Sequence, residues 1–80
     1  METNIAVVAI MVKDLDAVDR INALLHDFGD HIVGRMGLPY RQKNINVISV
    51  VMDAPQSIIN SLSGKLGMID GVSSKVLTAK

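Results

Sequence analysis

The chain contains the stretch TNIAVVAIMV from Thr3 to Val12 and, further along, the stretch INVISVVM from Ile45 to Met52. Both are rich in β-branched residues and too short for a helix of ordinary length, so we predict two strands. In each stretch, both alternating sets of side chains are largely apolar. Because a strand that is apolar on both faces is normally covered on both faces, we expect these two strands at the centre of a sheet.

A first helix is predicted between these strands, from Asp14 to Phe28. Apolar side chains recur there at three- and four-residue steps, which is the spacing of one helix face. They are Leu15, Val18, Ile21, Leu25 and Phe28. Asp14 is the expected N-cap, and Gly29 is the expected left-handed stop.

A second helix is predicted after the second strand. Its buried stripe consists of Ile58, Ile59, Leu62 and Leu66. Asp53 is the expected N-cap, Gln56 stands at the capping-box position, and Gly67 is expected to end the helix. Gly64 lies inside this helix at a cost of about 1 kcal/mol relative to alanine, so we expect close packing at that point.

Two less apolar stretches are predicted to be edge strands. Asp30 to Tyr40 is interrupted by two glycines, which favours an edge strand with a bulge. Val72 to Thr78 carries serines and a lysine and is the last predicted strand. Leu38 to Asn44 is predicted to be a turn or a long hairpin connection, and Asp70-Gly71 a tight turn.

The order of these elements predicts an α+β, ferredoxin-like βαββαβ fold, with a four-stranded antiparallel sheet and two helices on one face. Right-handed crossovers place the two strongly apolar strands in the middle of this sheet. The helices can cover only one of its faces. The second apolar face is then exposed or buried against another subunit, so we expect a homo-oligomer, either a dimer or a tetramer.

Composition excludes several classes of protein. A chain of 80 residues is expected to form one domain, and 49 % hydrophobic residues are too many for a disordered chain. The lack of cysteine excludes a disulfide framework, and eight basic residues balanced by eight acidic ones are unlike a free-standing nucleic-acid binder. The longest apolar run, Ile5 to Val12, is too short to span a membrane, and the start does not resemble a signal peptide. We therefore expect a cytoplasmic protein.

The two histidines, His26 and His31, are the candidate metal ligands. Imidazoles with the neighbouring Asp27 and Asp30 would suit zinc, nickel or iron. However, Gly29 separates them at the predicted helix end, and a third histidine is lacking. The pattern therefore favours two solvated polar residues at a helix end. A histidine there also interacts favourably with the negative end of the helix dipole.

The only basic cluster consists of Arg35, Arg41 and Lys43. Such a cluster could hold a phosphate or a carboxylate, but protection of an edge strand by positive charge is favoured. Capping and the helix dipole explain the carboxylates at positions 14, 16 and 19. No catalytic residue is predicted, because no serine lies in a nucleophile elbow and Ser63-Gly64-Lys65 lacks the upstream glycine of a phosphate-binding loop.

Three stretches carry a family resemblance: LLHDF at 24–28, RMGLPYR at 35–41, and LSGKLG at 62–67 with the Gly71-Val72 pair beyond it. With them the chain resembles the small iron-only hydrogenase system regulators, which belong with ACT-like domains and with the C-terminal domain of nickel-responsive repressors. The resemblance implies that residues 1–80 are a single ACT-like regulatory domain that forms homo-oligomers. It supplies no catalytic residues.

The chain departs from its relatives in ways that bear on function. We expect no DNA-binding segment before Ile5, and the histidine-rich metal pattern of the nickel-responsive repressors is not matched. ACT domains that bind amino acids usually carry a glycine-bearing turn between the first strand and the first helix. Here that turn is Lys13-Asp14-Leu15-Asp16. An effector could still bind there across a subunit interface, so the candidate effector residues are Lys13, Asp14, Asp16 and Arg35.

The leading hypothesis is a non-enzymatic, oligomeric regulatory module of an iron-only hydrogenase system. It would act through a protein partner or a small-molecule effector, with no cofactor, no direct contact with nucleic acid and no membrane. One alternative is a metal-sensing module that uses His26 and His31. Another is a small ferredoxin-like enzyme with its site at the subunit interface.

Overall fold

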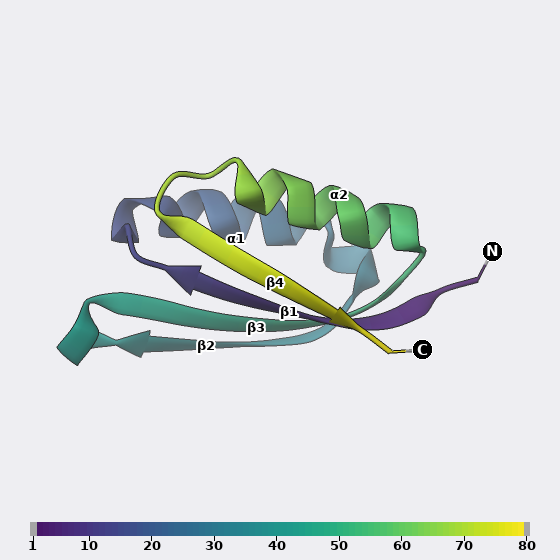
Figure 1. The fold of residues 1–80 in the computed structure, drawn as a ribbon, viewed down its shortest axis with the longest axis horizontal. Helices are drawn as coiled ribbons and strands as arrows, with labels where there is room; N and C mark the ends of the chain where they lie inside the picture. Colours follow the sequence, from purple (N-terminus) through teal and green to yellow (C-terminus); the bar gives the residue numbers. More distant parts are fainter. Residues whose placement is uncertain (1, 80) are drawn as a thin grey trace.

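The computed structural model describes residues 2–79, which form one four-stranded antiparallel sheet with both helices on the same face (Figure 1). The main elements are β1 (Asn4–Val12), α1 (Val18–Asp27), β2 (Ile32–Tyr40), β3 (Ile45–Ala54), α2 (Gln56–Gly67) and β4 (Val72–Thr78). Short 3-10 turns are η1 (Leu15–Ala17), η2 (Gly29–His31) and η3 (Arg41–Lys43). The strand order is β2-β3-β1-β4, so the predicted βαββαβ fold and the central position of the two most apolar strands are confirmed.

The core lies between the sheet and the helices. Val8 of β1 pairs with Val50 of β3, and both are fully buried at the middle of the covered face. Ile21 of α1 and Leu62 of α2 pack onto this layer without exposed surface. Burial of one such aliphatic side chain is worth about 1.5–3 kcal/mol, so the alternation of the two central strands stabilises the fold.

The start of the first helix differs from the prediction. The Asp14 carboxylate accepts a hydrogen bond from the Asp16 backbone N–H at 3.0 Å and therefore caps η1, whereas α1 begins at Val18 without a side-chain cap. Leu15, expected in the buried stripe, is 47 % exposed. The physical reason is the 3-10 turn, whose side chains do not continue the 3.6-residue spacing of the helix.

The end of this helix also differs. α1 ends at Asp27, and Gly29 begins η2 without the positive φ that was expected of a left-handed stop. The backbone instead tightens into a 3-10 turn, in which the His31 N–H donates to the Phe28 carbonyl at 2.9 Å. This turn leads directly into the edge strand.

The N-cap predicted for the second helix is wrong. Asp53 belongs to β3, and the cap position is occupied by Pro55, which has no side-chain cap hydrogen bond. Gln56 is not part of a capping box, because its amide oxygen accepts from Asn4 and its amide nitrogen donates to Asn60, each at 3.0 Å. The close packing expected at Gly64 is also wrong: an added Cβ would meet no atom within 4 Å.

The edge strand β2 carries the expected irregularity, a register shift between Ile32 and Gly34. It begins at Ile32 and, as predicted, ends at Tyr40. Leu38–Tyr40, which the sequence also suggested as the start of the turn, belong to the strand, since an edge strand tolerates a residue without an N–H. The connection to β3 is therefore only η3 and Asn44, which adopts a left-handed conformation. No helix within residues 2–79 has the length and apolarity required to cross a membrane.

The predicted turn at Gly71 before β4 is confirmed, and hydrogen bonds connect this turn to the residues that follow β1. The φ of Gly71 is 77°, and its carbonyl accepts from the N–H groups of Lys13 at 2.7 Å and Asp14 at 3.3 Å. A Cβ at this position would overlap the Cβ of Asp14. Both the backbone conformation and the close approach therefore require glycine.

We expect Gly71→Ala to lower the free energy of unfolding by about 1–3 kcal/mol, because alanine is strained at this φ and collides with Asp14. Urea unfolding at a fixed protein concentration measures the change. Gly64→Ala is the matched control, and we expect it to be neutral or stabilising by up to about 1 kcal/mol. Equal stability of the two variants would contradict this account of the turn.

Candidate functional site

The face of the sheet opposite the helices is apolar, and we call it the open face (Figure 1). The strand registers place three to five side chains of every strand on it. They are Ile5, Val7, Ala9 and Met11 of β1; Ile45, Val47, Ser49, Val51 and Asp53 of β3; Met36, Leu38 and Tyr40 of β2; and Ser73, Lys75 and Leu77 of β4. Only Asp53 and Lys75 in this set are charged, so the expectation of a second apolar face is confirmed.

One row of side chains on the open face is small at its centre. The register aligns Lys75, Ala9, Ser49 and Met36 in one row across the four strands. The two central members are small, while the rows on either side contain larger apolar side chains. A hollow of about 270 Å³ lies at the β1–β4 end of this region, lined in part by Ala9 and Met11. The open face is thus apolar and contains a shallow hollow beside β1 and β4.

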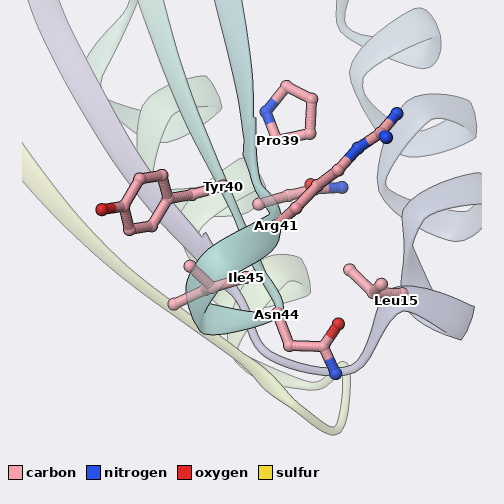
Figure 2. Close-up of a pocket in the computed structure, with 7 residues that line it drawn as sticks. Leu15, Pro39, Tyr40, Arg41, Asn44 and Ile45 are labelled. Carbon is pink, nitrogen blue, oxygen red and sulfur yellow. The ribbon is translucent and has the colours of Figure 1, made fainter.

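A second surface feature lies on the helix side of the sheet, between α1 and the β2–β3 hairpin, and we call it the α1–β2 groove. It consists of two adjoining hollows of about 180 Å³ each, which share Pro39 and Asn46. The first is lined by Leu15, Pro39, Tyr40, Arg41, Asn44, Ile45 and Asn46 (Figure 2). The second is lined by Val18, Asn22, Arg35, Gly37, Leu38, Pro39, Asn46 and Ile48.

The groove collects polar donors over apolar walls. Arg35 Nη2 donates to Asn22 Oδ1 at 2.7 Å and so connects the edge strand to α1. Figure 2 shows the Arg41 side chain extending past Pro39, while the Tyr40 ring points to the other side of the strand. Both guanidinium groups therefore belong to the groove side of the hairpin.

The four candidate effector residues are not brought into one hollow. Arg35 lines the groove, whereas Lys13, Asp14 and Asp16 are exposed and line none of the three hollows. The backbone N–H groups of Lys13 and Asp14 are used by the Gly71 carbonyl. An effector site at the turn after β1 stays a prediction.

The two histidines lie on separate elements. His26 is exposed in the last turn of α1, and the half-buried His31 ends η2. Within residues 2–79, no three side chains among His, Asp, Glu and Cys lie close enough to hold a metal ion. Because zinc sites in proteins use three or four protein ligands, a metal role for this pair gains no support from the geometry and stays a prediction.

The sequence analysis missed Asn22 and Asn46 of the groove. One signal was available for Asn46, because it has the same parity along β3 as Ile48 and Val50, which face the core. A polar side chain on the covered face of a central strand is unusual and indicates either a partner or a gap in the core. Asn22 gave no comparable signal, since it lies beside the apolar stripe of its helix.

The fold and the open face define the chain as a small ferredoxin-like α+β domain with an apolar, solvent-facing side of its sheet. The chain belongs to the TM1266-like family, whose description is "Iron-only hydrogenase system regulator, putative" and whose model matches residues 4–76. This match confirms the resemblance to iron-only hydrogenase system regulators. No protein with a curated description matches the chain.

Solved structures similar to the chain include the following two. The uncharacterized protein TM1266 from Thermotoga maritima is 36 % identical, with a TM-score of 0.94, and the match covers 99 % of this chain and 100 % of that one. A formyltetrahydrofolate deformylase from Pseudomonas putida KT2440 is 15 % identical, with a TM-score of 0.60, and the match covers 92 % of this chain but 28 % of the enzyme. The second likeness is one of fold alone.

We expect the double substitution of His26→Ala with His31→Ala to leave the assembly state intact and the free energy of unfolding within about 1 kcal/mol, since neither side chain is in the core. Metal analysis of the purified original protein is expected to find no stoichiometric zinc, nickel or iron. A stoichiometric metal that disappears in the double variant would contradict this expectation and establish the histidines as ligands.

Proposed function

We propose that this protein is a non-enzymatic, homo-oligomeric regulatory module of an iron-only hydrogenase system, which acts through protein or small-molecule contacts. The observation that carries the proposal is the open face. Exposed apolar patches of this kind on soluble domains usually serve as interaction surfaces. The family match supports the regulatory role.

A second copy of the chain is the occupant that best fits the open face. The face carries two charges of opposite sign, Lys75 and Asp53, so two copies can stack without extensive like-charge repulsion. Its four strands of about nine residues span roughly 30 Å by 19 Å, or on the order of 600 Å² for each subunit. This area approaches the roughly 800 Å² per partner of stable interfaces, and two sheets pack face to face about 10 Å apart.

The chain length makes such an assembly physically useful. An 80-residue domain without disulfides has a small core, which often supplies only about 3–5 kcal/mol. Burial of Val7, Met36, Leu38 and Leu77 against a partner would add apolar contacts that one subunit lacks. The same contacts would make the regulator's stability depend on its assembly.

Sedimentation at micromolar protein is expected to show a single species of at least twice 8.6 kDa. Met36→Lys places a charge on the open face and is expected to weaken assembly about tenfold or more, because a buried, unpaired ammonium is costly. The matched control is Met68→Lys: Met68 is 82 % exposed and follows α2, away from the open face. It should assemble like the original chain.

A monomer of the original chain at this concentration would overturn the assembly proposal. Equal effects of the two lysine variants would overturn the placement of the interface. Because both variants exchange the same residue types, net charge does not distinguish them.

We expect no specific complex with DNA. The eight basic residues are spread over several elements and are balanced by eight acidic residues. α2 contains a single basic residue, Lys65. α2 also needs Ile59, Leu62 and Leu66 for the core, so it cannot enter a groove as a recognition helix. Fluorescence anisotropy of the protein's own upstream DNA at physiological salt should show no specific binding at micromolar protein. A nanomolar, sequence-specific complex would contradict regulation through a separate DNA-binding partner.

A further inference from the structure

The α1–β2 groove exists because β2 has no side chain at Gly37. Gly37 pairs with Ile48 on the covered side of the sheet, and a Cβ at position 37 would meet no atom within 4 Å. α1 therefore does not fill the space above this part of the edge strand. The next residue of β2 on the same side is Pro39, so the hollow continues toward the hairpin turn.

Each of the two hollows is lined by one cationic group without an anionic partner among residues 2–79. Arg35 and Arg41 make no ion pair with any residue of the 2–79 range, although a guanidinium offers five N–H donors. Arg35 uses one donor on Asn22 Oδ1 at 2.7 Å, which orients the guanidinium plane and leaves donors free. The Asn22 amide nitrogen and the Asn46 amide provide further donors beside it.

Apolar side chains form part of the remaining lining, and the volume of each hollow limits the size of the ligand. Val18 and Ile48 line one hollow, and the half-exposed Leu15 lines the other. Each hollow measures about 180 Å³, and one water occupies roughly 30 Å³ of liquid, so each accommodates roughly six small heavy atoms. A ligand of the hollow beside Gly37 therefore needs an anionic end near Arg35 and a short apolar part.

From these observations we propose that the α1–β2 groove binds a small organic carboxylate in the hollow beside Gly37, with Arg35 on the carboxylate and Val18 and Ile48 against its apolar chain. Two parallel N–H donors of a guanidinium match the two oxygens of a carboxylate. The inference rests on the proposed regulatory function, because it names the chemical class of the effector. It does not depend on how the subunits assemble.

Titration of the ¹⁵N-labelled full chain with butyrate, followed by amide chemical shifts, tests the proposal. Saturable shifts are expected at residues of α1 and β2 that line the groove. Butylammonium, which has the same chain and the opposite charge, is expected to produce none. Inorganic phosphate is expected to bind more weakly, since it cannot use the apolar wall. Phosphate that binds more tightly than butyrate would overturn the carboxylate assignment.

Two variants locate the site independently. Arg35→Met is expected to weaken butyrate binding about tenfold, as loss of a charge-assisted hydrogen-bonding group does. Gly37→Val keeps both arginines, fills the hollow with a residue that strands favour, and is expected to abolish binding. Arg20→Met on the exposed side of α1 and Gly64→Ala on α2 are the controls, and both should bind as the original chain does.

Equal weakening by Arg35→Met and Arg20→Met would show only a general charge effect and would overturn the site. A titration without saturable shifts would overturn it as well, and the arginines would then serve only to protect the edge strand. Sedimentation of the same samples separates the two proposals: a monomer that still binds butyrate contradicts the assembly, and an oligomer that does not bind contradicts the groove.

Discussion

Two helices cannot cover both faces of a four-stranded sheet, and the other features of this protein follow from that constraint. β1 and β3 are apolar on both faces, so whichever face the helices take, a second apolar face remains. The helices pack on the side of Val8 and Val50 and form the core there. The side of Val7 and Val51 has no second layer on it, and this is the face that we propose binds a second copy.

The edge strand β2 serves both surfaces to which we assign a role. Its side chains alternate, so Met36 and Leu38 lie on the open face while Arg35 and Gly37 lie on the groove side. A ligand in the groove would therefore rest on the reverse side of a strand that borders the proposed subunit interface. This arrangement gives a contiguous physical connection between a small-molecule site and an assembly surface, through one strand rather than through the packed core.

The sequence pattern was sufficient to predict the fold and the strand order. It failed where a capping residue was compatible with more than one local structure. Asp14 is a capping residue, as its side chain indicates, but it caps a 3-10 turn rather than the helix. Asp53 resembles an N-cap, yet pairing of β3 with β1 extends the strand through it and leaves Pro55 at the helix start. In both cases tertiary pairing and backbone geometry outweigh a preference worth about 1 kcal/mol.

The site was harder to foresee than the fold. Hydrophobic alternation by itself determined which side chains share a face, because successive side chains of a strand point to opposite sides and helical spacing marks one stripe. It also determined that one apolar face would lack a cover. Only the tertiary structure decided that Arg35 meets Asn22 from a different element, and that the space beside Gly37 joins the space beside Leu15. Such contacts depend on how far α1 lies from an edge strand, a distance set by the packing of the whole core rather than by any local pattern.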